Sequence, residues 1–372
     1  MEHNQNLGKK KKKNNKPLFI LVGALAFFSF FIYLIARPGQ QQIAIEQIQV
    51  SNNINDVKAI YDRYRFDLLE SDENGNKIIS PEFQEAVRNK LQSLKLTDEE
   101  LTECLKWIPP TRTNLNLIVV PDLSRRILLI PQQVENDISA LSAIWNSFEK
   151  FSKFRQDTKD KLKIDVTIDQ SNPIFESIAN ELNFDLSSHK GKSNRLYFNE
   201  ERSRQFNDKI NEMYASAIAK PLGSDYILYF RRDLQKNIKK PTLFDDYQNK
   251  IIVLTDGYIE LEESRDYGNG KRWDYTPCTS LLYNSVNIGN TNNEISRLGL
   301  NIPVASGVDL SNTEILICEV NERNKGKDFE ILKAYWTDWL QRMKVPEKNI
   351  SFIGRNSANN ITKQQIEEFI KN

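Results

Sequence analysis

The sequence predicts an α/β fold: a doubly wound, mainly parallel sheet flanked by helices, preceded by a transmembrane helix and a small helical region. Three patterns lead to this prediction. Short apolar runs alternate with amphipathic stretches in the C-terminal part of the chain, which is typical of a sheet crossed by helices. An uninterrupted apolar run lies near the N-terminus. Between these regions, apolar residues recur at helical spacing.

The N-terminal region predicts a membrane anchor. Lysines fill positions 9–13, Lys16 follows, and residues 18–36 then contain no charged residue. This length is close to the roughly 20 residues of a membrane-spanning helix and exceeds the apolar core of a cleaved signal peptide. The lysines should hold residues 1–17 in the cytoplasm and place the bulk of the chain in the periplasm or outside the cell. The sequence thus predicts a single-pass membrane protein of the cell envelope.

Composition indicates a globular protein and does not support nucleic acid as a partner. Hydrophobic residues make up 39% of the chain and charged residues 27%, which is enough for one large core. The formal net charge is +1 although the tail is basic, so the remainder is slightly acidic and lacks a basic patch. The spacing of Cys104, Cys278 and Cys318 fits neither a disulfide framework nor a zinc site. Abundant Lys, Asn and Ile indicate an AT-rich bacterium.

Residues 37–110 are predicted to form a helical stalk or small bundle with a linker. One helix follows from the spacing of Val57, Tyr61 and Tyr64, and a second begins at Ser80-Pro81, because proline is tolerated in the first helical turn. A third helix opens at Thr97, where Thr97 and Glu100 form a capping box. The pair Pro109-Pro110 then separates this region from the sheet domain.

Residues 72–82 resemble the calcium-binding loop of an EF-hand in part. Four positions of that motif match Asp72, Asn74, Asn76 and Ile79. Lys77 stands where the loop needs glycine, and the bidentate glutamate arrives one residue early as Glu82. Because the twelfth-position carboxylate is missing, we expect a polar turn here rather than a Ca²⁺ site.

Residues 111–372 are predicted to form the α/β domain, with an insert at residues 258–312. Strands are expected at residues 116–120, 162–168, 251–254, 315–320 and 350–353, with a short edge strand at 196–198. Two helices are expected from apolar stripes, one with Ile138, Leu141, Trp145 and Phe148 and one with Phe206, Ile210, Met213 and Ile218. Further helices are expected at residues 226–234 and 329–343, and a final helix should begin at the capping box of Thr362. The insert carries aromatic residues, Tyr267, Trp273, Tyr275 and Tyr283, which suit either a recognition surface or a minor core.

Acidic residues end two of the predicted strands. Asp122 follows one apolar run and Asp256 another, while Ser224 and Asp225 precede the helix predicted between them. Open parallel sheets bind ligands at the carboxyl ends of their strands, where the strand order reverses. Carboxylates and hydroxyls that converge there from three loops can hold a hard, oxygen-seeking cation.

This constellation resembles the von Willebrand factor type A domain over roughly residues 114 to 372. Asp122-Leu-Ser124 is similar to the start of the family's Asp-x-Ser-x-Ser motif, Ser224 matches its threonine, and Asp256 in Thr-Asp-Gly matches its last carboxylate. The resemblance implies a bound Mg²⁺ ion whose shell is completed by an acidic residue of a partner protein. The implied metal-site residues are Asp122, Ser124, Ser224, Asp225 and Asp256.

One position departs from the family pattern. Arg126 stands where the motif has its second serine, beside Arg125. A guanidinium can pair with a carboxylate in place of a metal ion. An occupied Mg²⁺ site and an Arg126 ion pair that closes the site are therefore alternative predictions.

Enzymatic signals are weak in this sequence. The histidines are His3 and His189, no Gly-x-Ser-x-Gly motif occurs, and Gly191-Lys192-Ser193 lacks the first glycine of a phosphate-binding loop, so no nucleotide is expected. A metal-dependent hydrolase that uses Asp122 and Asp256 is the alternative, but Ser124 has no evident base. The predicted function is non-enzymatic: a membrane-anchored protein that binds an unknown partner protein at the cell envelope.

Overall fold

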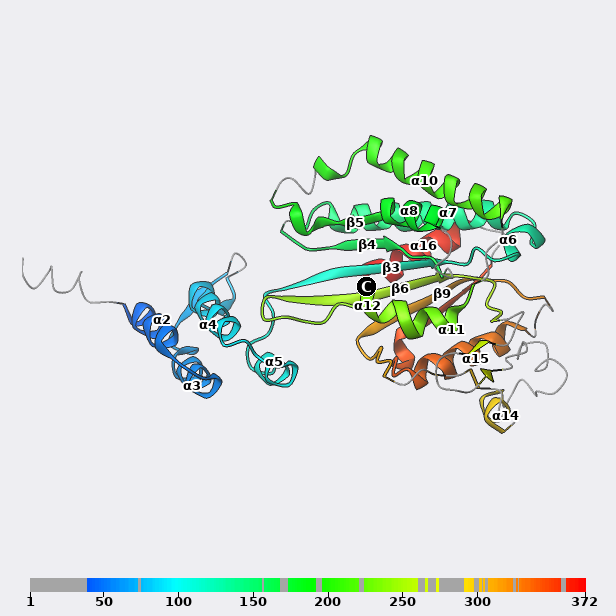
Figure 1. The fold of residues 1–372 in the computed structure, drawn as a ribbon. Helices are drawn as coiled ribbons and strands as arrows, with labels where there is room; N and C mark the ends of the chain where they lie inside the picture. The colour runs from blue at the N-terminus through cyan, green and yellow to red at the C-terminus, as the bar shows by residue number, and fades with distance from the viewer. Residues whose placement is uncertain are drawn as a thin grey trace, which may run out of the picture. The chain divides into compact units, whose positions relative to one another are not determined.

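The computed structural model describes residues 39–72, 75–155, 157–167, 173–191, 196–220, 224–259, 265–266, 272–273, 291–297, 301–302, 304, 307–323, 326, 328–355 and 359–372. The chain divides into two compact units, Met1–Pro109 and Pro110–Asn372. Both are drawn in Figure 1, and each is described by itself below.

The predicted membrane localisation is corrected by the structure. In the ranges described above, no helix is both long enough and apolar enough to cross a bilayer. The helices α7 (Gln133–Ser152) and α10 (Glu200–Ala219) reach 20 residues each, but both are amphipathic and carry charged side chains. This finding contradicts the prediction of a single-pass membrane protein. The predicted tail at residues 1–17 and the predicted span at residues 18–36 themselves lie outside the described residues.

The N-terminal unit is mainly helical. Its elements are α2 (Gln40–Val50), α3 (Ile54–Tyr64), β1 (Leu69–Ser71), β2 (Lys77–Ile79), α4 (Pro81–Ser93) and α5 (Asp98–Leu105). The predicted capping box is confirmed: the Thr97 hydroxyl accepts from Glu100 N at 3.2 Å, and the Glu100 carboxylate accepts from Thr97 N at 2.9 Å. The core of the unit includes Tyr61 stacked on Phe83, with ring centroids 6.0 Å apart.

A polar turn connects β1 to the antiparallel β2. The Asp72 carboxylate accepts from Asn76 N at 2.8 Å and from Asn76 Nδ2 at 3.0 Å. Glu82 accepts instead from Gln41 Nε2 of α2, at 2.5 Å. The Asp72 carboxylate thus stabilises the turn itself, and Glu82 connects α4 to α2.

The second unit contains a six-stranded sheet in the order β10-β9-β6-β3-β4-β5. The strands are β3 (Arg112–Pro121), β4 (Lys161–Ile164), β5 (Asn183–Asp185), β6 (Asp245–Leu254), β9 (Thr313–Val320) and β10 (Ile350–Gly354). All neighbours pair in parallel except β4 and β5. The predicted α/β class with a mainly parallel sheet is confirmed. The strand order reverses between β3 and β6, so the crevice expected to bind ligands lies at the carboxyl ends of these strands.

Helices cover both faces of this sheet (Figure 1). One face, with Val119 and Leu254, packs against α7, α8 (Pro173–Glu181), α10 and α16 (Asn359–Lys371). The opposite face, with Val120 and Val253, packs against α11 (Tyr226–Tyr229), the π-helix η2 (Phe230–Leu234), α14 (Thr291–Arg297) and α15 (Asp328–Arg342). The short helix α12 (Gln235–Asn237) follows η2 directly. Because the central strands are buried on both faces, their sequences are continuous apolar runs rather than alternating ones.

One predicted element and one predicted boundary were wrong. Leu196 and Tyr197 are helical rather than part of an edge strand, and the antiparallel edge of the sheet is β5. The Phe198 ring packs against Trp145 at 6.0 Å, so this segment fills the core beneath α7 instead of pairing with a strand. The final helix α16 begins at Asn359, before the Thr362 capping box that was expected to open it.

The insert at residues 258–312 is described only in parts. These include β7 (Arg265–Asp266), β8 (Arg272–Trp273) and α14. Tyr267, Tyr275 and Tyr283 lie outside the described residues, as does Cys278. Trp273 belongs to β8, which pairs antiparallel with β7.

Candidate functional site

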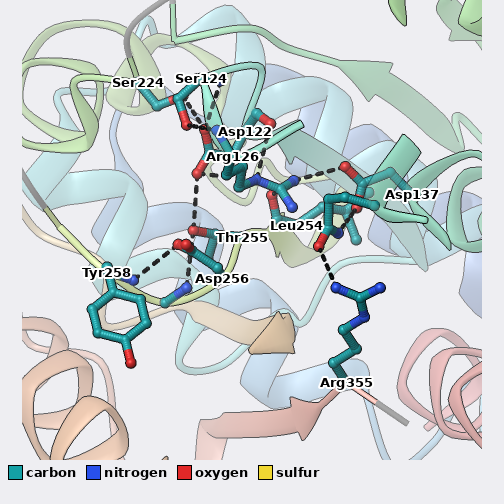
Figure 2. A network of polar contacts seen from close by, with 12 residues as sticks. Asp122, Ser124, Arg126, Asp137, Ser224, Leu254, Thr255, Asp256, Tyr258 and Arg355 are labelled. Atoms are coloured by element: carbon teal, nitrogen blue, oxygen red, sulfur yellow. Dashed lines mark hydrogen bonds and ion pairs between the residues drawn. The ribbon is translucent and has the colours of Figure 1, made fainter. Parts of the chain in front are cut away.

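Asp122 is the centre of a buried polar cluster at the carboxyl end of β3. Its backbone N donates to Leu254 O of β6 at 2.9 Å, which continues the β3–β6 pairing by one residue. The side chain is nearly inaccessible, with 3% of the residue exposed. Oδ1 accepts from Ser124 N at 2.9 Å and from the Ser224 hydroxyl at 2.6 Å, and Oδ2 accepts from the Thr255 hydroxyl at 3.1 Å (Figure 2). The structure therefore brings Asp122, Ser124 and Ser224 together.

Ser224 and Asp225 have different roles although they are adjacent. Ser224 donates its hydroxyl hydrogen to Asp122. Asp225 caps α11, because its Oδ1 accepts from Leu228 N at 2.9 Å. The cap fixes the start of α11, and so positions Ser224 over Asp122.

Arg126 lies under this cluster as the first residue of α6 (Arg126–Leu129). Its Nε is 3.2 Å from Asp122 Oδ2 and 3.1 Å from Asp122 O. Its Nη2 donates to Asp137 Oδ2 of α7 at 2.7 Å and to Leu254 O at 3.0 Å (Figure 2). Burial alone would lower the pKa of Arg126, but the charges of Asp137 and Asp122 outweigh it and raise the pKa. The guanidinium therefore remains charged inside the protein.

Asp137 is a site residue that sequence reasoning missed. It is fully buried, and it also accepts from Gln133 Nε2 at 2.8 Å and from the Tyr214 hydroxyl at 3.0 Å. Burial raises its pKa, while Arg126 opposes that shift. One signal was available in the sequence: Asp137 stands four residues before Leu141, on the stripe that was predicted to be apolar.

Asp256 lies two residues after the end of β6. It makes no hydrogen bond or ion pair with Arg126 among the contacts between described residues. It is 5% exposed. Oδ1 accepts from Tyr258 N at 3.2 Å, and Oδ2 lies 3.8 Å from Arg323 Nη2. Burial, followed by the charge of Asp122, raises the pKa of Asp256 to about 7. Asp256 is therefore partly protonated near neutral pH.

The turn after β6 requires the glycine of the Thr-Asp-Gly sequence. Gly257 has a φ of +92°, and an added Cβ would lie 3.1 Å from Val320 Cγ1. Its backbone N donates to the Thr255 hydroxyl at 3.2 Å, and that hydroxyl in turn donates to Asp122. A tight, glycine-dependent turn thus connects the two acidic strand ends.

Glu319 is a second acidic residue that the sequence did not identify as part of the site. It lies at the end of β9, where Ile353 pairs with Cys318 and Gly354 pairs with Val320, so Glu319 is the extra residue of a β-bulge. Its φ is +70°, it is 4% exposed, and its Oε2 has no hydrogen-bond partner among the described residues. Burial, followed by the charge of Asp137, raises the pKa of Glu319 to about 7.

The oxygen atoms around Asp122 suit a guanidinium better than Mg²⁺. Both carboxylate oxygens already accept from protein donors, and Ser224 uses its hydroxyl hydrogen on one of them. Mg²⁺ needs near-octahedral oxygen ligands at about 2.0–2.1 Å, whereas a guanidinium needs acceptors in its plane. Within the described ranges, no group of three or more His, Cys, Asp or Glu side chains is arranged to hold a metal ion.

A nucleophile with an adjacent base is not assembled by the described residues of this site. The Ser124 hydroxyl accepts from Arg126 N at 3.5 Å. His189 lies in another segment, where its ring contacts that of Tyr197 at 4.3 Å between centroids. The geometry therefore does not favour Ser124 as a nucleophile.

An exposed apolar ridge adjoins the cluster. We use this name for Leu128, Leu129, Ile130 and Pro131, which follow Arg126 and the buried Ile127 in the chain. Leu128 is 51% exposed and Leu129 is 76% exposed. Arg355 fixes the end of the ridge, because it donates to Pro131 O and, at 3.3 Å, to Gln133 Oε1. Figure 2 shows Arg355 near Asp137.

Comparison with known proteins gives little further information. No protein-family model matches the sequence, and no curated protein is similar to it. The pilus adhesin SpaC from Lactobacillus rhamnosus GG matches 70% of this chain and 30% of its own, with 11% identity and a TM-score of 0.34. Proximal thread matrix protein 1 from the mussel byssus matches 70% of this chain and 46% of its own, with 10% identity and a TM-score of 0.29. This chain thus spans less than half of either structure. Similarities this low support no conclusion about function.

Proposed function

We propose that the α/β unit is a protein-binding domain of the von Willebrand factor type A kind, and that its partner binds at the carboxyl edge of the sheet. The strand order supports this proposal, because it reverses between β3 and β6, and open parallel sheets bind ligands at the carboxyl ends of the strands beside such a reversal. The positions of Asp122, Ser124, Ser224 and Asp256 at the same edge also support it.

The observation that carries the proposal is the exposed apolar ridge. A run of consecutive exposed apolar residues is unfavourable in water, and such runs on protein surfaces usually mark binding sites. Burying one leucine side chain against a partner contributes about 1.5–3 kcal/mol. Leu128 and Leu129 are therefore suited to anchor an interface.

The ridge is also held rigidly. Ile130 N donates to Arg126 O at 3.0 Å, Gln133 N donates to Ile130 O at 3.2 Å, and Arg355 is bonded to Pro131 O. A loop that is already ordered loses little conformational entropy when it binds. This property favours recognition of a folded protein surface.

The hydrolase alternative has less support. Asp122 is already bonded to Arg126 and three other donors. No other feature of the described site favours hydrolysis.

Site-specific photo-crosslinking in the native cells tests the proposed function. A photoreactive phenylalanine analogue at position 129 should produce one dominant adduct with another protein, identified by mass spectrometry. The matched control is the same analogue at position 154, where Phe154 is 66% exposed and the adjacent Arg155 donates to Thr113 O at the amino end of β3. Absence of an adduct at position 129, or the same adduct at both positions, would contradict the proposal.

A further inference from the structure

The carboxyl edge carries more buried acid than one cation can neutralise. Asp122, Asp137, Asp256 and Glu319 are each no more than 5% exposed. Arg126 is in contact with Asp122 and Asp137. The remaining two acids, Asp256 and Glu319, are those whose pKa is raised to about 7.

Arg126 connects two of the strand ends that a bound metal ion would connect, those of β3 and β6, and joins them to α7. Through Asp122 it contacts the end of β3, through Leu254 O the end of β6, and through Asp137 the helix α7. It does so from α6, the helix that carries Leu128 and Leu129. A positive charge at this position therefore holds the loops of the edge together.

Asp137 explains how the arginine is accommodated. A buried guanidinium is stable only if its charge is paired. Nε and Nη2 of Arg126 are bonded, whereas its Nη1 is buried without a hydrogen-bond partner among the described residues. Asp137 supplies the second carboxylate, and Gln133 and Tyr214 satisfy the rest of that carboxylate. A serine at position 126 would leave Asp137 without its cation, so Arg126 and Asp137 act as a pair.

We propose that Arg126 is a built-in cation that takes the place of a divalent metal ion at the carboxyl edge, so that the edge recognises its partner without metal. This inference rests on the proposed function for its reference to a partner. A divalent ion bound to Asp122 would lie close to the permanently charged guanidinium of Arg126. The repulsion between these two positive charges would oppose binding of the ion.

Metal titration of the full-length protein tests this inference without any partner. Isothermal titration with Mn²⁺, and electron paramagnetic resonance of the free ion, should show no stoichiometric binding to the wild type. The variant Arg126→Ser combined with Asp137→Asn removes both buried charges and supplies an oxygen ligand. It should bind one Mn²⁺ about tenfold or more tightly than the wild type.

The control variant is Arg125→Ser, which removes an exposed arginine next to the site and should not create metal binding. Stoichiometric Mn²⁺ binding to the wild type would overturn the inference. The inference would also be overturned if the double variant folds, as shown by a cooperative melting transition, but does not bind Mn²⁺. If the double variant does not fold, the melting temperature of the wild type is measured with Mn²⁺ and, separately, with a chelator. A higher melting temperature with Mn²⁺ would contradict the inference, and equal melting temperatures would support it.

The partner-dependent part has a separate readout. The adduct formed at position 129 should be unchanged in the presence of a chelator, and its loss on chelation would overturn the inference. Absence of any adduct would refute only the proposed function, because the Mn²⁺ titration does not depend on a partner. The two failures are thus distinguishable.

Discussion

At the scale of single residues, the carboxyl edge depends on a buried charge pair. Arg126 and Asp137 lie 2.7 Å apart with side chains that are 3% and 0% exposed. Two such charges are stable together because each compensates the desolvation of the other, and removing one leaves the other unpaired. The pair is therefore a weak source of net stability but a strong constraint on the sequence.

Asp137→Asn should destabilise the α/β unit by about 3 kcal/mol, because Arg126 would keep its charge in a buried site without its closest carboxylate. Urea unfolding followed by circular dichroism measures the change. The matched control is Asp208→Asn on the exposed surface of α10, which should change stability by less than about 0.5 kcal/mol. Equal effects of the two substitutions would show that the buried pair carries no special constraint.

Asp256 should make stability depend on pH. Its pKa is raised from 3.8 to about 7 in the folded state, so the folded protein holds this proton more tightly than the unfolded chain. The contribution of Asp256 is therefore fully present below pH 4 and is lost as the pH rises through about 7. Asp256→Asn should match the wild type at pH 4 and exceed its stability by about 1–3 kcal/mol at pH 8. Unfolding curves at both values test this, and a less stable variant at pH 8 would contradict it.

At the scale of elements, the β-bulge between β9 and β10 illustrates what a linear sequence does not reveal. The run of residues 315–320 predicts a buried strand, which β9 confirms. The conformation of Glu319 depends on its pairing with β10, more than thirty residues away, because the register shift occurs between Ile353 and Gly354. Strand periodicity alone could not predict that an acid at this position would be buried near Asp137.

Position 319 provides a test of backbone strain. With a φ of +70°, a residue with a Cβ is disfavoured there by about 1–2 kcal/mol, whereas glycine is not. Glu319→Gly should therefore be more stable than Glu319→Ala by about 1 kcal/mol, since both variants remove the carboxylate. Thermal unfolding of the two variants gives the difference. An alanine variant as stable as the glycine variant would exclude strain at the bulge.

Other elements were missed because they are short or compositionally plain. The helix α2 starts in the glutamines at residues 40–42, and its apolar contacts, Ala44 and Ile48, are few. The strand β5 has three residues with a single apolar one, Phe184, so its existence depends on its partner β4. Long amphipathic helices such as α7 and α10 were predicted correctly because several core contacts repeat along each of them.

At the scale of the whole molecule, the sheet accounts for most of what the sequence could predict. Its central strands are apolar on both faces, a pattern that requires helices above and below, and the structure contains both layers. The carboxyl ends of parallel strands lie along one edge, so Asp122 and Asp256 could be expected near each other from topology alone. Whether a metal ion or Arg126 supplies the positive charge was left open by the sequence, because the answer depends on Asp137 from another layer.

The two-faced burial of the sheet leads to a final prediction for the whole unit. Ile317 in β9 is completely buried under α15, so Ile317→Asp places an unpaired carboxylate inside the core. The penalty of more than about 4 kcal/mol is a large fraction of the roughly 5–15 kcal/mol by which domains are stable. Soluble expression and the near-ultraviolet circular dichroism of the fold should therefore be lost. Ser351→Asp in the adjacent β10 introduces the same side chain at an exposed position and should be tolerated, because its carboxylate stays in water. Normal folding of the Ile317 variant would mean that β9 is not a central strand.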